Sequence, residues 1–222
     1  MQTSAPKTPA HEIIYRRLRD MILFGDLAPG QAITIQGLVD EFAVSMTPVR
    51  EAIRRLTAEG ALELKGNRRV QVPVIGPKRF EELSFARLQI EPKLAEIAAK
   101  SITRAEIDVL SSIDAQLNLA IAAGDSKGYM LQNHRFHFHL YAAAQSAILM
   151  PIAETLWLRF GPLYRVISGR YGTANLVDQH HEALECLSNG DAKGVAHAIA
   201  ADIEQGLQIV FAEGLEDKPT RP

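Results

Sequence analysis

The period of the hydrophobic residues constrains the fold of this chain more than any other feature. Between His11 and Gly60, and again beyond Pro77, apolar residues recur at helical spacing. Alternation with period two is confined to residues 62–74. Turns such as Gly124-Asp125 divide the helical stretches into short units. We therefore predict a mainly α protein with one small β-hairpin.

Composition narrows the class of protein. A chain of 222 residues with 47% hydrophobic and 23% charged residues is a globular chain of one or two domains, not a disordered one. No apolar run approaches the roughly 18 residues that a membrane span needs, and the N-terminus lacks the apolar segment of a secretory signal. The single Cys186 cannot form an internal disulfide. We expect a cytoplasmic protein without membrane contact.

The positions of turn and linker residues along the chain predict two domains. The second should be an antiparallel all-α bundle of about six helices, because helical patterns there follow one another through short turns. Those patterns run over 78–100, 104–123, 126–145, 147–169, 175–189 and 192–214. The predicted organisation is a flexible tail over 1–9, a first domain over 10–76, a linker over 77–79, the bundle over 80–215 and a frayed tail over 216–222.

Charge is distributed unequally between the two predicted domains. Residues 1–76 carry 10 Lys+Arg and 8 Asp+Glu, a net +2, whereas residues 77–222 carry 14 and 18, a net −4. The front of the chain is therefore basic and the back acidic, which suits a polyanionic partner for the first domain.

The third predicted helix of the first domain carries the clearest chemical signal. Thr47 is its expected N-cap and Pro48 its first helical residue, where a missing N–H does no harm. Its buried face is formed by Val49, Ala52, Ile53 and Leu56, and its exposed face by Thr47, Arg50, Glu51, Arg54 and Arg55. A short helix with a packed back and a front of threonine and arginine suits the major groove of DNA.

Two short alternating runs follow that helix. Leu62 and Leu64 are predicted to share one buried face, as are Val70, Val72 and Val74. The polar turn between them, residues 65–69, carries two arginines where a wing would reach the neighbouring DNA backbone. Three helices, with Thr34 capping the second, and this hairpin make a winged helix-turn-helix.

The first domain resembles a known family of DNA-binding proteins. The stretches Leu27–Gly30, Val44–Leu56 and Glu59-Gly60 are similar to the N-terminal signature of GntR-family transcriptional regulators over residues 11–76. This resemblance implies binding to a double-stranded DNA operator. With the helix and wing above, it predicts DNA contacts at Gln36, Ser45, Thr47, Pro48, Arg50, Arg54, Gly66, Asn67 and Arg68.

Met46 departs from the GntR pattern. The family often has arginine at this position, between Ser45 and Thr47. Methionine cannot make the bidentate contact with guanine that arginine makes, so the usual base preference of the family is not carried over.

Residues 80–214 resemble the FCD effector domain of the FadR subfamily of GntR regulators. Arg87–Glu91, Asn133–His137 and His180 followed by Asp191 carry the similarity. It implies a helical bundle that receives a small organic acid beside a divalent metal held by one Asp and three His. His137 and His180 match two family histidines, whereas Asn133 replaces the aspartate and Asp202 replaces the last histidine.

The predicted metal set is therefore Asn133, His137, His180 and Asp202, whose oxygen and imidazole donors suit Zn²⁺, Ni²⁺ or Mn²⁺. Asn133 and His137 point from one helical face at i, i+4 spacing. A buried Asp202 needs a metal, an arginine or a protonated histidine beside it. The alternative is a metal-free polar pocket in which the two histidines are hydrogen-bonded core residues, and the sequence leaves both open.

The resemblance also predicts an effector site at Arg87, Asn133, His137 and His180. Arg87 is expected either to clamp a carboxylate or to form a solvent-facing salt bridge. Further pocket candidates are Tyr129, Trp157, Arg159, Tyr164 and Arg165. The other bundle histidines, expected at the surface or at helix ends, are His134, His139, His181 and His197.

Together these features predict a ligand-responsive transcriptional regulator. The resemblance implies a repressor that binds inverted half-sites as a homodimer and is released by a small organic acid. One alternative is a metal sensor, in which the ion is the signal. Another is a metal-dependent enzyme that activates water at His137, His180 and Asp202. The absence of HExxH, GxSxG and P-loop patterns argues against any enzyme.

Overall fold

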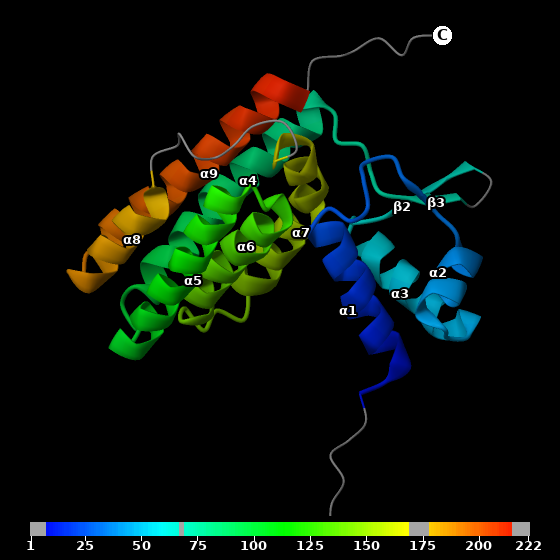
Figure 1. Ribbon diagram of the computed structural model, residues 1–222, viewed down its shortest axis with the longest axis horizontal. Coiled ribbons are helices and arrows are strands. Elements are labelled where there is room, and N and C mark those ends of the chain that lie inside the picture. Colours follow the sequence, from blue (N-terminus) through cyan, green and yellow to red (C-terminus); the bar gives the residue numbers. More distant parts are fainter. Residues whose placement is uncertain (1–7, 67–68, 169–177, 215–222) are drawn as a thin grey trace, which may run out of the picture.

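The computed structural model of the protein describes residues 8–66, 69–168 and 178–214. Figure 1 shows two bodies, a small head on the right and a larger helical bundle on the left. We call residues 10–76 the head and residues 77–214 the bundle. The described residues form nine helices and a three-stranded sheet, which confirms the predicted mainly α class. None of these helices is long and apolar enough to cross a membrane.

The head has the predicted order of three helices followed by a hairpin. Its elements are α1 (Ala10–Leu23), β1 (Ala32–Ile33), α2 (Ile35–Phe42), α3 (Met46–Ala58), β2 (Glu63–Lys65) and β3 (Arg69–Gln71). The Thr34 side chain caps α2 as predicted, accepting from the Gly37 amide at 3.0 Å. A Cβ on Gly37 would lie 2.8 Å from the Thr34 hydroxyl, so the cap itself accounts for this glycine.

The start of α3 differs from the prediction. Ser45, not Thr47, is the N-cap residue, and Met46 and Thr47 precede Pro48 inside the helix. Pro48 still belongs to the first turn, where backbone N–H groups have no intrahelical partner, so it is tolerated there. The predicted buried face of Val49, Ala52, Ile53 and Leu56 is confirmed.

The sheet contains a strand that the hydrophobic pattern did not reveal. Its order is β1-β3-β2, all antiparallel, with Leu64 opposite Val70 and Ile33 also paired with Val70. The predicted shared face of Leu62 and Leu64 is wrong, because Leu62 is 1% exposed and Leu64 is 62% exposed. Leu62 precedes the edge strand and packs under α3, whereas Leu64 lies on that open edge.

The run after β3 is also only partly buried. Val70 and Val72 are buried as predicted, but Val74 is 61% exposed, because the chain has left the sheet after Gln71. The predicted linker over 77–79 forms the first turn of the next helix, since proline is well suited to a first helical position. The extended connection between head and bundle therefore ends at Gly76. The predicted tails over 1–9 and 216–222 fall outside the described residues, except for residues 8 and 9.

Six helices form the bundle: α4 (Pro77–Ala98), α5 (Arg104–Ala123), α6 (Ser126–Ala142), α7 (Leu149–Ser168), α8 (Gln179–Ser188) and α9 (Ala192–Gly214). Two of the turns repeat one device. Gly124 and Gly190 take left-handed backbone, and the aspartate after each accepts from an amide of the next helix, as Asp125 does from Gly128 at 2.9 Å. These dipeptides place α6 against α5 and α9 against α8.

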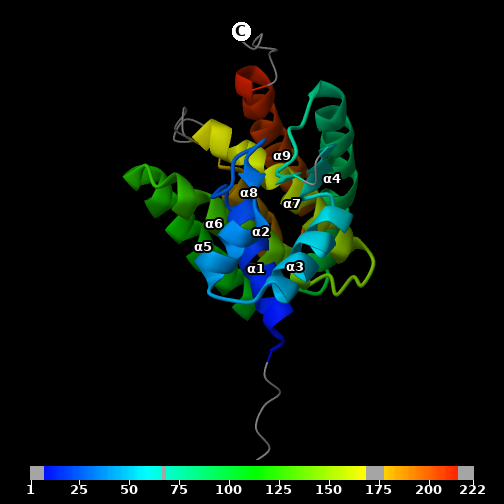
Figure 2. The ribbon, with the colours of Figure 1, turned by 90° about the vertical axis from the view of Figure 1, so that its right-hand side faces the viewer.

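Helix α7 belongs to both bodies. Its residues Phe160 and Leu163 lie in the bundle core, whereas Trp157 and Leu158 lie in the core of the head. In Figure 2, which views the molecule from the head, α1 lies in front of the bundle and packs against α7. Two polar contacts join the bodies as well: Lys127 pairs with Asp26 at 2.7 Å, and Arg159 Nε donates to the Glu59 carbonyl at 2.9 Å.

Gly161 sits at the closest point of this junction, and its replacement tests how tightly the two bodies are packed. A Cβ there would lie 2.5 Å from the Leu23 carbonyl oxygen, so α1 and α7 would have to separate. We expect Gly161→Ala to lower the free energy of unfolding by about 1–3 kcal/mol, measured by urea denaturation. Gly66→Ala is the control, because a Cβ at Gly66 meets no described atom within 4 Å. Equal stability of the two variants would contradict this account.

Candidate functional site

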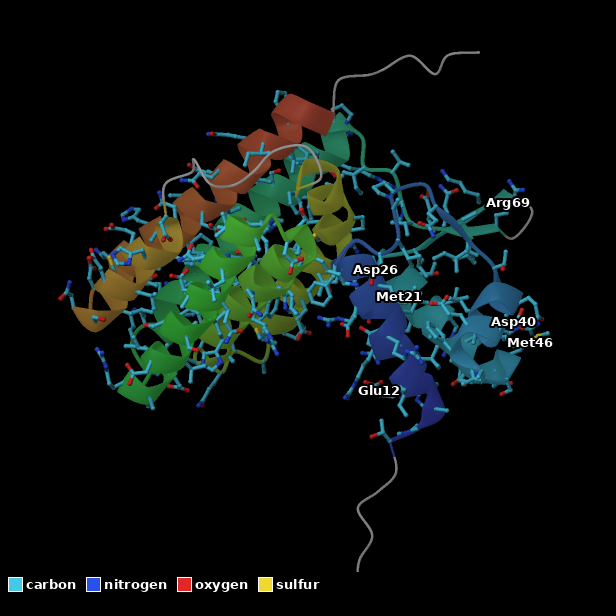
Figure 3. All side chains as sticks on the ribbon, viewed as in Figure 1. Glu12, Met21, Asp26, Asp40, Met46 and Arg69 are labelled. Carbon is cyan, nitrogen blue, oxygen red and sulfur yellow. The ribbon has the colours of Figure 1, made fainter. Side chains whose placement is uncertain are left out.

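The exposed face of α3 carries unengaged positive charge. Ser45, Thr47, Arg50 and Arg54 are all exposed, and Pro48 is half-buried beside them. Among the described residues, no ion pair engages Arg50 or Arg54. Figure 3 places Met46, at the start of α3, and Arg69, on the wing, on the side of the head remote from the bundle. This side is therefore open to a large anionic partner.

Arg55 shows how the head keeps its other basic groups for structure. Its guanidinium pairs with Glu12 at 3.0 Å and Glu59 at 3.1 Å and lies 3.6 Å from the centroid of the Tyr15 ring. These contacts join α3 to α1. Although helical spacing places Arg55 near Arg54, its guanidinium is therefore engaged within the head.

The other predicted DNA contacts lie at the edge of this face. Gln36 is exposed on α2 and donates to Asp40 at 2.8 Å. Gly66 is exposed at the wing tip, whereas Asn67 and Arg68 lie outside the described residues. Met46 is 46% exposed, and the Arg50 guanidinium approaches its sulfur at 3.7 Å. Met46 therefore lies against the guanidinium of Arg50.

In the bundle, three of the four predicted metal ligands converge. His137 Nε2 lies 3.0 Å from Asp202 Oδ2 and 3.4 Å from His180 Nε2, and His180 Nε2 lies 3.8 Å from Asp202 Oδ1. We call these three residues the histidine cluster. They come from α6, α8 and α9, and the two imidazoles are buried. Asn133, one turn before His137, is 4% exposed, and among the described residues its Oδ1 has no hydrogen-bond partner.

The outward nitrogen of each imidazole lies beside a residue that sequence reasoning missed. His180 Nδ1 lies 3.4 Å from Asp114 on α5, and His137 Nδ1 lies 3.0 Å from the Tyr141 hydroxyl. Burial and the charge of Glu91 raise the pKa of Tyr141 well above its usual value, so the hydroxyl keeps its proton. The Tyr141 pairing repeats the i, i+4 spacing of one helix and could have been found from sequence, whereas Asp114 gave no local signal.

The hydrogen bonds of Tyr141 show which nitrogen of His137 carries a proton. Tyr141 has one hydroxyl proton and donates it to Glu91 Oε2 at 2.9 Å, so its oxygen accepts the proton on His137 Nδ1. The lone pair of a neutral His137 then points from Nε2 toward the Asp202 carboxylate. This contact is repulsive unless a second proton or a cation lies between the two atoms.

Burial and mutual charges shift the pKa values of all three residues of the histidine cluster. Burial lowers the pKa of His137 despite the neighbouring Asp202 carboxylate. For His180, burial opposes the charged form, but the carboxylates of Asp202 and Asp114 outweigh it and raise the pKa. Burial alone would raise the pKa of Asp202, yet the two histidines lower it to about 2. The cluster is thus a place where an anionic carboxylate is held by positive charge.

Arg87 is buried and paired with a carboxylate of its own helix. It is 1% exposed, so the solvent-facing alternative is wrong, and its guanidinium pairs with Glu91 at 2.6 Å and 3.3 Å. The rings of Trp157 and Phe160 cover it at 4.7 Å and 4.6 Å. Because Glu91 occupies this guanidinium, an effector carboxylate would have to compete with Glu91 for Arg87.

One of the remaining histidines is packed more than expected. His134 stacks on Phe138 at 4.3 Å and meets Phe24 of the head edge-on at 5.5 Å, so its expected position at the surface or a helix end is wrong. His139 is half-buried in the last turn of α6, a helix end as predicted. The exposed His181 pairs with Glu185 as a surface histidine does, and His197 is also exposed. Among the pocket candidates, the side chains of Tyr164 and Arg165 lie outside the described residues.

Two described cavities lie in the bundle or at its junction with the head. Asn133 lines a cavity of about 10 Å³ together with Leu23, Phe24, His134 and Trp157, a volume comparable to one water molecule. A larger cavity of about 350 Å³ lies where the wing and linker meet α4 and α7, between Arg79 and Arg159, and none of the cluster lines it.

Comparison with known families accounts for both bodies. Residues 10–72 match the bacterial regulatory proteins of the gntR family, and residues 82–205 match the FCD domain. The chain belongs to the GntR family. Its FCD domain agrees with the FadR subfamily, and it is a ligand-responsive DNA-binding transcriptional regulator.

Similar proteins support this assignment across most of the chain. The HTH-type transcriptional regulator McbR of Escherichia coli K12 is 26% identical over 199 residues, which cover 88% of this chain and 90% of McbR. The solved structure of E. coli McbR has a TM-score of 0.87 at 25% identity, covering 93% and 99% of the two chains. The HTH-type transcriptional repressor RspR of E. coli K12 is 26% identical over 201 residues, covering 90% and 88%. These relatives are named as regulators and not as enzymes.

The exposed arginines of α3 give a direct test of DNA binding. We expect Arg50→Ala and Arg54→Ala each to weaken binding to a duplex selected from a random-sequence pool by about 5- to 150-fold, since each removes a charged contact in the groove. Fluorescence anisotropy at fixed salt measures the loss. Arg104→Ala on α5 removes the same charge far from the head and should change affinity by less than about twofold. Similar losses for Arg104→Ala and Arg50→Ala would contradict the assignment.

His134 predicts a pH dependence of stability. Burial, with the charge of Arg19, lowers the pKa of His134 from 6.5 to about 3 in the folded protein. The unfolded chain therefore takes up this proton first, and stability is lost as pH falls below 6.5, by at most about 1.4 kcal/mol per pH unit. Urea denaturation between pH 7 and 5 should show a shallower slope for His134→Gln than for the wild type. His181→Gln should keep the wild-type slope, and parallel curves for all three would refute the assignment.

Proposed function

We propose that this regulator is a repressor whose bundle binds a small organic acid beside a divalent cation. The cation would be held by His137, His180 and Asp202, with Asn133 as a fourth donor, and Zn²⁺, Ni²⁺ and Mn²⁺ suit this set. The protein would act in the cytoplasm as a homodimer on an operator with inverted half-sites. Binding of the acid would favour the arrangement of heads that leaves the operator.

The spacing of the three donors is the observation that carries the cation proposal. The two Nε2 atoms lie 3.4 Å apart, Asp202 Oδ2 lies 3.0 Å from His137 Nε2, and Asp202 Oδ1 lies 3.8 Å from His180 Nε2. A tetrahedral ion with bonds of about 2.0–2.1 Å requires donors about 3.3–3.4 Å apart. The two imidazoles meet this spacing, and the Asp202 carboxylate has to turn one oxygen toward both of them. A cation between His137 Nε2 and Asp202 Oδ2 also removes the repulsion between their lone pairs.

The outer partners support the same reading. Metal-bound histidines usually donate their second N–H to a carboxylate or another fixed acceptor, which holds the ring in the ligating tautomer. Here Asp114 stands beside His180 and the Tyr141–Glu91 pair beside His137. Both Nε2 atoms therefore face inward, toward Asp202. The unpartnered buried Oδ1 of Asn133 adds a donor atom that gains a partner if the ion binds nearby.

Repression and dimerisation rest on relatives and symmetry. RspR, which aligns with 90% of this chain, is named a transcriptional repressor. Winged helix-turn-helix regulators read inverted half-sites by placing two copies of the recognition helix about one DNA turn apart, which requires a two-fold homodimer. The single α3 of this chain provides one such copy.

A metal sensor is the second candidate, and the convergence of the three donors favours it. They lie close enough together to hold an ion in the absence of any organic ligand. In this case the ion alone would change the affinity for DNA.

Thermal stability separates these functions. A ligand that binds only the folded protein raises the melting temperature as its concentration rises. We expect Zn²⁺ to stabilise the chelator-treated protein, and one member of a panel of small mono-, di- and tricarboxylic acids to stabilise it further. If the acid raises the melting temperature equally in the presence of chelator, the acid binds without a metal ion, and the proposed cation is not part of the effector site. Stabilisation by Zn²⁺ alone, with Zn²⁺-dependent DNA affinity, would establish the metal sensor.

A matched pair of histidines controls for adventitious zinc. His180→Ala should abolish the stabilisation by Zn²⁺, while His181→Ala, which removes an exposed neighbour on the same helix, should leave it unchanged. If neither variant alters the shift, zinc binds elsewhere and the cluster is not the metal site.

A further inference from the structure

The side chain of Trp157 stands between the histidine cluster and the head. It is 3% exposed and forms part of the head core, although α7 is a helix of the bundle. Its indole nitrogen donates to Glu91 Oε2 at 2.7 Å. One side chain therefore has its polar atom in the buried network of the bundle and its ring among the apolar residues of the head.

Two contacts connect Trp157 to the cluster. The ring of His137 lies 5.0 Å from that of Trp157, centroid to centroid. In addition, the Tyr141 hydroxyl, which accepts from His137, donates to the same Glu91 oxygen that accepts from Trp157. A displacement of His137 on ligand binding thus reaches the indole through direct ring contact and through one shared acceptor atom.

On its other side Trp157 meets the end of α1. The ring of His134 packs edge-on against both Trp157 and Phe24, each at 5.5 Å. Leu23, Phe24, Trp157 and Gly161 line the cavity of about 10 Å³, so little free space separates these groups. Close-packed groups cannot absorb a movement, and a shift of the indole must therefore move α1.

Helix α1 in turn holds the DNA-reading helix. The Tyr15 hydroxyl donates to Glu59 at the end of α3, and the Arg55 guanidinium of α3 covers the Tyr15 ring. The other polar contacts of the junction, Lys127–Asp26 and Arg159–Glu59, touch no residue of the cluster. They join the bodies without sensing the ligand.

We propose that Trp157 is the positioning residue that transmits the state of the histidine cluster to α1 and hence to α3. This inference rests on the proposed function in one respect, that the cluster is the regulated site. It adds a specific route, His137–Tyr141–Glu91–Trp157–α1, and separates it from junction contacts that only hold the bodies together.

A mutant cycle on the full-length protein tests the route without any ligand. His137→Gln perturbs the cluster, and hydrogen exchange of the amides of residues 18–24 reports on the end of α1. We expect His137→Gln to change these exchange rates by about threefold or more, within the range of measured couplings. In the Trp157→Phe background, which keeps an aromatic ring but removes the donor to Glu91, the same change should be at most half as large on a logarithmic scale.

Controls make every outcome decisive. Lys127→Ala weakens the junction away from the route, and His137→Gln should keep its full effect in that background. The proposal is overturned if His137→Gln changes the exchange rates equally in the wild-type and Trp157→Phe backgrounds. It is also overturned if Lys127→Ala reduces the effect of His137→Gln as much as Trp157→Phe does. If His137→Gln does not fold, Tyr141→Phe replaces it, because it cuts the link to Glu91 while keeping the ring.

Zinc then separates the two proposals. In the wild type, Zn²⁺ added to chelator-treated protein should change exchange of the same amides, and in Trp157→Phe it should bind with unchanged affinity but leave them at most half as responsive. Failure of Zn²⁺ to bind the wild type refutes the proposed metal site, while the mutant cycle still decides the role of Trp157. Binding with an undiminished response in Trp157→Phe refutes the coupling route alone.

Discussion

The carboxylate of Glu91 is the interaction on which the interior of the bundle depends. It is fully buried and accepts from Arg87, Tyr141 and Trp157, which lie on three different helices. A buried charge is tolerated only when it is paired and its lone pairs are satisfied, and removing one partner of such a pair costs about 3–5 kcal/mol. These donors meet that condition. Glu91 therefore fixes the positions of α4, α6 and α7 relative to one another. It also fixes the indole of Trp157, which lies in the core of the head.

The polar network and the histidine cluster are two layers of one interior. The inner layer, His137, His180 and Asp202, brings together groups whose protons and lone pairs match only with a proton or cation between them. The outer layer, Asp114, Tyr141 and Glu91, fixes the orientation of the imidazoles. A regulator gains from this arrangement, because the outer layer is rigid and a change of occupancy in the inner layer has few ways to relax.

Local spacing explains what the sequence predicts well and what it does not. The helices of the bundle and the buried face of α3 follow from apolar residues at helical period, and His137 and His180 converge as the family pattern implies. β1 has only two residues, so no alternation marks it, and Leu64 is exposed because the edge strand receives no cover. Asp114 meets His180, and Trp157 meets the head, through packing between helices distant in sequence, which a single chain without an alignment does not encode locally.

The sharing of α7 also limits how this regulator can be recombined. The family is built from a DNA-reading unit and an effector unit, which invites chimeras joined at the extended segment before Pro77. A cut there would separate the head from Trp157 and Leu158, which complete its core, and from Gly161, which admits the Leu23 carbonyl. A transplanted head needs a host helix with the same three positions. The functional boundary between the units thus runs along one face of α7, not through the linker.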